Sequence, residues 1–214
     1  EGNFIFDRDM ESTGSSTSGA TITNLKMEDT NQEYSKLILG VTDYANIYAK
    51  LGGSQIKNAK VRFSTGEDVK AKFEHDFLYG GGFNTAYKFG PDNIYIVGLN
   101  GDFSYYEADT KNLDITGSTV TDISGKIKIK EIQAGAYAGR KFAVNEKISL
   151  LPYAGVFYNK FNTKTGGIKY TASGTQYTLT FDSDAEDEVG VATGVDVNLS
   201  ENFTLNAEGR FIAG

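Results

Sequence analysis

The stretch DFLYGGGFNTAYKF, residues 76–89, alternates between two kinds of side chain. Every second residue from Phe77 to Phe89 is aromatic except Gly81 and Thr85, and the positions between them are small or polar except Leu78. Successive side chains of a β-strand point to opposite faces of the sheet, so this period of two predicts a strand with one aromatic face. What the chain can fold into depends on whether that face is the inside or the outside.

The same alternation recurs along the chain, most clearly in residues 34–41, 46–53, 93–107, 188–199 and 203–211, and less cleanly in 3–10, 131–143 and 148–159. Short connections with turn residues (42–46, 90–93, 143–147, 200–202) alternate with long ones rich in Ser, Thr, Gly, Asp and Lys (11–31, 56–74, 109–125, 163–185). This order predicts a single all-β domain over residues 1–214, an up-and-down antiparallel meander with polar loops at one end. Within the last loop, residues 166–181 are expected to form a hairpin extension.

Composition excludes several classes of protein. The net charge of −7 argues against a nucleic-acid partner, because binding phosphates requires a basic surface. The absence of cysteine excludes disulfides and thiolate metal sites. The sequence contains no run of about 18 apolar residues, so it predicts no transmembrane helix.

The smaller face of the strands is unusual for a surface in water. It carries mainly Gly, Ala, Ser and Asn with scattered charges, which suits the crowded inside of a narrow barrel. Aromatic residues gather toward both ends of the other face in 76–89, as they do at the two interfaces of a membrane barrel. The stretch is about 40 Å long, which gives about 30 Å of height at a tilt of about 40°, the thickness of a bilayer core. We therefore predict a transmembrane β-barrel with aromatic residues facing lipid; the alternative is a soluble β-barrel or sandwich that binds an apolar ligand.

Strands such as DFLYGGGFNTAYKF and SLLPYAGVFY, joined by short turns and long polar connections, resemble the OmpA/OmpX-like outer-membrane β-barrel proteins. The resemblance covers most of the chain and implies the outer membrane of Gram-negative-type bacteria. It also implies tight turns at the periplasmic end and long loops outside. The chain departs from the family in having no following peptidoglycan-binding domain and no terminal aromatic residue, since it ends RFIAG.

Counting strands gives nine, whereas single-chain bacterial barrels have an even number. We expect about ten strands, with the last absent from this sequence or supplied by a neighbouring chain at the open edge. A parallel seam between the first and ninth strands, or a barrel of eight strands, is the alternative.

Two sets of candidate residues follow from placing the small face inside. The positions expected to form a charge network in the lumen are Asp7, Asp9, Lys36, Lys50, Lys88, Asp102, Glu131, Lys141, Glu188, Asp196, Glu208 and Arg210. The positions expected to face lipid are Phe77, Tyr79, Phe83, Tyr87, Phe89, Tyr95, Val97, Leu99, Phe103, Val191, Val195, Phe203 and Leu205. Because acids and bases are nearly balanced, the lumen set predicts salt bridges that fill the barrel rather than a ring of one sign that selects ions.

The only histidine, His75, cannot act together with Asp76, because neighbouring residues of a strand point to opposite faces. It is read as a histidine at the rim, and no catalytic residue is predicted. The acidic run DSDAEDE, residues 182–188, lacks the spacing of a calcium loop and is read as solvated. No cofactor or metal is expected.

These inferences predict a barrel of structural or small-porin type with a largely plugged lumen and long loops for surface contacts. Its partners would be membrane lipid, including lipopolysaccharide. The alternative within the membrane is a barrel enzyme that acts on lipid or peptide, which would need a carboxylate or hydroxyl beside His75.

Overall fold

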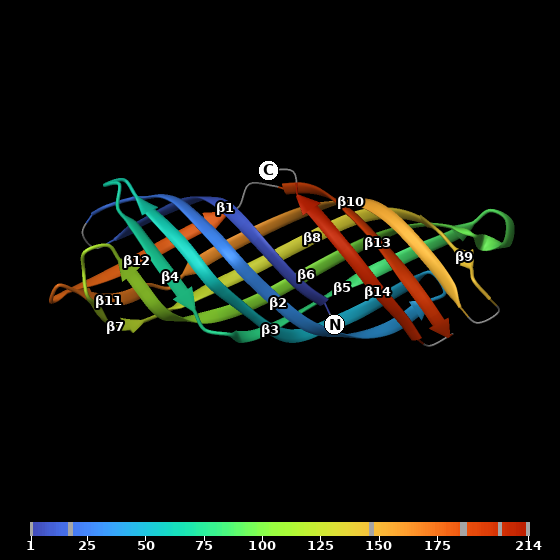
Figure 1. Cartoon of the computed structure of the whole chain (residues 1–214), viewed down its shortest axis with the longest axis horizontal. Helices are drawn as coiled ribbons and strands as arrows, with labels where there is room; N and C mark the ends of the chain where they lie inside the picture. Colours follow the sequence, from blue (N-terminus) through green and yellow to red (C-terminus); the bar gives the residue numbers. More distant parts are fainter. Residues whose placement is uncertain (1, 17–18, 146–147, 185–187, 201–202, 213–214) are drawn as a thin grey trace.

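In the computed structural model, the described residues are 2–16, 19–145, 148–184, 188–200 and 203–212, and nearly all of them lie in one sheet (Figure 1). The strands are β1 (Gly2–Ser16), β2 (Ile22–Thr42), β3 (Ala45–Phe63), β4 (Asp68–Phe73), β5 (Asp76–Phe89), β6 (Tyr95–Ile115), β7 (Val120–Ser124), β8 (Lys126–Arg140), β9 (Phe142–Ala143), β10 (Ser149–Thr165), β11 (Ile168–Ala172), β12 (Thr175–Asp184), β13 (Glu188–Ser200) and β14 (Phe203–Ile212). A 3-10 turn, η1 (Pro91–Asn93), joins β5 to β6. The all-β prediction is confirmed. No helix within the described ranges has the length and apolar character needed to cross a membrane.

Most strands that follow one another along the chain lie side by side or in line, although β7 pairs with β11 and β12 pairs with β1. Every ladder among the described residues is antiparallel. Several strands succeed each other along one line: β3 pairs with β5 through residues 45–54 and with β4 through residues 59–62. In the same way, β10 pairs with β13 through residues 149–159 and with β12 through residues 162–164. The predicted up-and-down antiparallel order is therefore observed.

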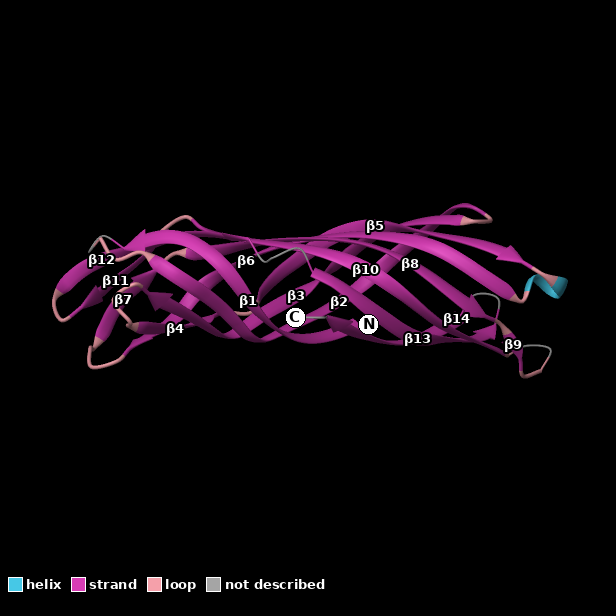
Figure 2. Cartoon of the chain, turned by 90° about the horizontal axis from the view of Figure 1, so that it is seen from above, coloured by secondary structure: helices cyan, strands magenta, loops and turns pink. Residues whose placement is uncertain are grey.

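The molecule is long and has two distinct ends (Figures 1 and 2). We call the part that carries β4, β7, β11 and β12, with the adjoining parts of longer strands, the tip half. The part that carries β5, β9, β13 and β14 and ends at the tight turns is the turn half. In the tip half the ladders form a continuous ring through β1, β2, β3, β4, β6, β8, β10 and β12.

In the turn half the described ladders do not close. There β14 pairs only with β13 and forms one edge of the sheet. The other edge is β1, which pairs there with β2. No parallel seam joins β1 to β14 within the described residues. A count of ten strands, or of eight, remains a prediction.

The long connections predicted as polar loops are mostly strands, so that prediction is wrong. The described residues within 11–31, 56–74, 109–125 and 163–185 mostly continue the ladders, leaving short tips such as 64–67 and 116–119. The reason is an apolar residue at every second position, for example Val69, Ala71 and Phe73 of β4, all of which are buried. The hairpin predicted within residues 166–181 is confirmed as β11 and β12, which pair from Ile168–Leu179 to Ala172–Thr175.

The inside of the tip half is a hydrophobic core. The largest fully buried side chains there are Leu25, Met27, Ile56, Phe73, Leu78, Tyr106, Ile127, Ile129, Phe161, Ile168 and Leu179. Its outside carries ion pairs, including Arg62–Asp68, Lys126–Asp109 and Lys128–Glu107. The tip half therefore has the apolar interior and charged exterior of a barrel in water.

The turn half has the opposite distribution. Its exposed residues include Leu37, Leu39, Ile47, Leu51, Phe77, Tyr79, Phe83, Tyr87, Val97, Leu99, Ile132, Val156 and Val191. Strand β8 shows the change within one strand: its outward residues are Lys126, Lys128 and Lys130, then Ile132 and Ala134. Its inward residues change from Ile127 and Ile129 to Glu131 and Gln133. The alternation of β8 continues without a break, but its apolar residues point inward in the tip half and outward in the turn half.

Candidate functional site

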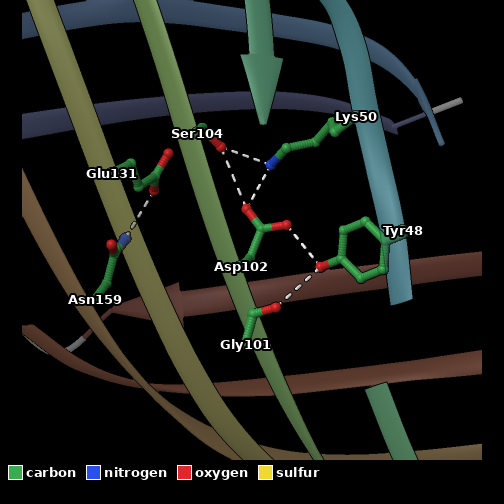
Figure 3. Close-up of polar contacts among 7 residues, drawn as sticks. All are labelled: Tyr48, Lys50, Gly101, Asp102, Ser104, Glu131 and Asn159. Atoms are coloured by element: carbon green, nitrogen blue, oxygen red, sulfur yellow. Dashed lines mark hydrogen bonds and ion pairs between the residues drawn. The ribbon is translucent and has the colours of Figure 1, made fainter. Parts of the chain in front are cut away.

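Polar side chains on β3, β6, β8 and β10 contact one another inside the turn half, and we call this set the polar layer (Figure 3). Its centre is an ion pair between Lys50 on β3 and Asp102 on β6, with side chains 3% and 18% exposed. The Lys50 ammonium also donates to Ser104 Oγ at 2.6 Å, and Ser104 donates to the Asp102 carboxylate at 3.2 Å. The charges are therefore both paired and hydrogen-bonded, which a buried pair requires.

Tyrosine rings surround this pair. Tyr48 donates its hydroxyl to the second carboxylate oxygen of Asp102 at 2.7 Å (Figure 3). Tyr34 lies under the Lys50 ammonium at 4.7 Å, and Lys36 lies over the Tyr48 ring at 4.5 Å. The two lysines are thus held by ring faces as well as by a carboxylate.

Glycines on the inner face make room for these rings. A Cβ atom added at Gly82 would lie 2.6 Å from the Tyr48 hydroxyl, and one added at Gly52 would lie 2.7 Å from Tyr34 Cβ. A side chain at Gly82 would therefore collide with the Tyr48 ring, which lies across it.

Further polar contacts lie around the lumen. Asn159 on β10 donates to Glu131 on β8 at 3.0 Å (Figure 3). Tyr137 donates its hydroxyl to Asn84 Oδ1 at 2.7 Å. The arrangement can neutralise and fix charges inside the barrel.

Of the residues predicted for the lumen network, the structure brings Lys50 and Asp102 together, with Lys36 nearby. Glu131 accepts a hydrogen bond from the Asn159 side-chain amide. Lys88 is exposed near the end of β5, and Lys141 lies between β8 and β9, outside both strands. Asp196 is half-buried on β13. The side chains of Asp7, Asp9, Glu188, Glu208 and Arg210 lie outside the described residues.

Sequence reasoning missed Tyr34, Tyr48, Ser104 and Asn159 as members of the layer. The signal was present for two of them: Tyr48 shares the inner face with Lys50, and Ser104 shares it with Asp102. Charge alone does not identify these hydroxyl partners.

Most residues predicted to face lipid are exposed on the outer wall of the turn half. These are Phe77, Tyr79, Phe83, Tyr87, Phe89, Tyr95, Val97, Leu99, Phe103 and Val191. Val195 is half-exposed, and the side chains of Phe203 and Leu205 are outside the described residues. Their contact with lipid remains a prediction.

His75 is exposed, and its imidazole lies against Gly53 on the outer wall. Within the described part of the chain it has no hydrogen bond or ion pair.

No group of three or more carboxylate or histidine side chains among the described residues is arranged to hold a metal ion. Much of the acidic run 182–188 lies outside them.

A family model described as "outer membrane protein beta-barrel domain" matches residues 37–213. The chain belongs to this family. An outer-membrane β-barrel domain is located in the bacterial outer membrane, so the predicted resemblance and location are confirmed, and the alternative of a soluble barrel is wrong.

Among solved structures, this outer-membrane barrel is similar to the transport unit of the autotransporter AIDA-I from Escherichia coli. The identity is 13% and the TM-score 0.34, over 100% of this chain and 85% of that chain. A likeness at that score carries no argument about function. A comparison with curated proteins finds no match.

Proposed function

We propose that this outer-membrane barrel is a sealed, structural protein that presents a rigid β-sheet extension beyond the membrane. The observation that carries the proposal is the hydrophobic core inside the tip half, built by side chains from strands all around the ring. The turn half spans the bilayer with its apolar outer wall, and the tip half stands in water with its charged outer wall.

The lumen is obstructed at two successive levels. The polar layer of Lys50, Asp102 and Ser104 comes first from the turn end. The core follows, with Phe73, Tyr106 and Phe161 essentially without exposure. An ion that crossed this core would exchange its water for mostly apolar side chains, which costs several kcal/mol or more. A small-porin role would need a continuous wet path, so the structural role is the better supported of the two.

The proposed orientation places the tips outside the cell and the tight turns in the periplasm, as for other outer-membrane barrels. Lys36 and Ile38, on inner-face positions near the tight turns, are exposed, which supports a lumen that is wet at that end only. No enzymatic activity is part of the proposal, since His75 has no catalytic partner among the described residues.

Conductance in planar bilayers tests the seal. Purified protein should insert, as judged by protection of the turn half from protease, and should give no steady current steps. A double variant, Phe73→Ala with Phe161→Ala, removes two core rings and should permit brief openings. Large, stable and ion-selective steps from the unmodified protein would overturn the proposal.

A further inference from the structure

Two lysines on the outer wall lie at the boundary between its charged and apolar parts. Lys130 on β8 and Lys160 on β10 are both exposed. The ladder pairs Lys130 with Asn162 and Ile132 with Lys160, so the two lysines are diagonal neighbours on one face. Within the described residues, neither ammonium group has a hydrogen bond or ion pair.

The lysines farther from the apolar wall differ in this respect. Lys126 lies 3.4 Å from Asp109, Lys128 lies 3.4 Å from Glu107, and Lys164 lies 2.6 Å from Asp182. The two cations at the boundary are therefore open to an external anion, whereas their neighbours toward the tip are neutralised by carboxylates.

Directly below the lysine pair, the same two strands form an apolar groove together with β5 and β6. Ile132 and Tyr158 come first on the outer face, and the wall then recedes because β8 and β10 carry alanines. The groove has a volume of about 770 Å³, and its floor and sides include Val97, Leu99, Ala136, Ala138, Ala154 and Val156. Tyr44 and Tyr87, whose rings lie 6.2 Å apart, contribute to its lining toward the tight turns.

The vertical distance between the two features suits one lipid molecule. Ala136 lies six residues along β8 from Lys130, which is about 20 Å along the strand and about 15 Å of depth at a tilt of about 40°. One leaflet contributes about 15 Å of a hydrocarbon core about 30 Å thick. An acyl chain that starts at the lysines therefore ends within the groove.

We propose that this wall binds a phosphate-bearing lipid of the leaflet next to the tip half, with its phosphate on Lys130 and Lys160 and an acyl chain in the alanine groove. Given the orientation proposed above, this is an outer-leaflet glycolipid. The two ammonium groups supply charge for the phosphate, and the groove supplies shape for the chain.

Native mass spectrometry of the detergent-solubilised protein tests the site, with diphosphorylated lipid A as the probe. Wild-type protein should retain one lipid A molecule through detergent removal. Lys130→Ala and Lys160→Ala should each weaken retention about fivefold, since each lysine near an anionic surface contributes on the order of 1 kcal/mol. Lys126→Ala is the matched control, on the same strand and face, and should change retention less than twofold.

The groove is tested separately by filling it. Ala136→Phe should weaken retention of lipid A by about fivefold or more, because the chain and the ring cannot share the space. Ala49→Phe, on the outer wall of β3 and away from the groove, should leave retention unchanged. Dephosphorylated lipid A should be retained poorly by every variant, and inorganic phosphate alone should not compete at concentrations equal to the lipid.

Equal losses in the Lys126 and Lys130 variants would mean diffuse charge attraction and would overturn the site. Competition by free phosphate would show a small-anion site and would also overturn it. Protein that conducts no ions but retains no lipid would leave the proposed structural function standing and reject only this inference.

Discussion

At the scale of single residues, breaking the ion pair of Lys50 and Asp102 should lower the free energy of unfolding more than breaking an exposed ion pair. Replacing Asp102 by Ala leaves the Lys50 ammonium, whose side chain is 3% exposed, without its carboxylate. Breaking a buried pair in this way costs about 3–5 kcal/mol of the free energy of unfolding. Urea-induced unfolding in lipid vesicles, followed by circular dichroism, measures the loss.

Two further variants give this prediction its control. Lys126→Ala breaks an ion pair whose partners are both about half-exposed, and should cost less than about 1 kcal/mol. Lys50→Met combined with Asp102→Leu removes both charges and should recover most of the stability. Equal costs for the Asp102 and Lys126 variants would show that the polar layer contributes no more than a surface pair.

Asp68 on β4 should respond to acid in a predictable direction. Hydrogen bonds from Arg62, at 2.8 and 3.1 Å, hold the pKa of the Asp68 carboxyl below its ordinary value of 3.8. Because the folded pKa is the lower one, the contribution to stability is present above about pH 4 and is lost as the pH falls through the folded pKa. Arg62→Ala should raise the Asp68 pKa toward 3.8, as an NMR titration would show, and an unchanged pKa would contradict this cause.

At the scale of elements, the strands of the turn half could be predicted from sequence, whereas in the tip half only the hairpin of β11 and β12 was predicted. In 76–89 the two faces differ in size, so the alternation is plain. In the tip half the same period is carried by residues such as Ile127 and Ile129 between Lys126, Lys128 and Lys130, within segments rich in Ser, Thr and Gly. Overall polarity there suggests a loop, while the position of each apolar residue specifies a strand.

The lumen shows the same limit. Alternation placed Lys50, Asp102 and Glu131 on the inner face, but which of them meet depends on the stagger between strands. Lys50 reaches Asp102 across β5, whose Gly80 and Gly82 separate β3 from β6 in the ladder. The residue pattern of a single strand does not determine its register relative to the neighbouring strands. The charged partners could therefore not be assigned from the sequence.

Because the tip-half segments are strands, protease access to the native chain should be confined to the hairpin tips. A protease recognition sequence inserted between Ser173 and Gly174, in the turn of β11 and β12, should be cut in intact cells under the proposed orientation. The same insertion between Asp43 and Tyr44, in the tight turn of β2 and β3, should be cut only after the envelope is opened. Cleavage at Asp43–Tyr44 alone in intact cells would reverse the orientation.

At the scale of the whole molecule, we expect the exchange of faces along long strands such as β8 to set where the barrel sits in the membrane. An apolar outer wall favours lipid and a charged outer wall favours water, so the proposed function places the edge of the bilayer near Lys130 and Ile132. Sliding the barrel toward the periplasm would bury the Lys126–Asp109 and Lys128–Glu107 pairs in hydrocarbon. The position is therefore held by both halves together.

Closure of the ring gives a prediction for the molecule as a whole. In the tip half a ladder joins β1 to β12, with Ser12 opposite Ser183. In the turn half no ladder among the described residues joins β1 to β14. Facing Cα atoms in an antiparallel ladder are about 4.5–5.5 Å apart, within the range that a disulfide spans. The chain has no cysteine of its own, so introduced pairs can be tested without background.

Ser12→Cys with Ser183→Cys should therefore form a disulfide within one chain upon mild oxidation, and the denatured protein should migrate faster on a gel until it is reduced. Val195→Cys with Ala207→Cys, facing each other on β13 and β14, is the positive control. Phe4→Cys with Phe211→Cys, on β1 and β14, should remain reduced within the chain, because no ladder holds those strands together. Efficient bridging of that last pair without bridging of residues 12 and 183 would mean that the barrel closes through β14 in the membrane instead of through β12 at its tip.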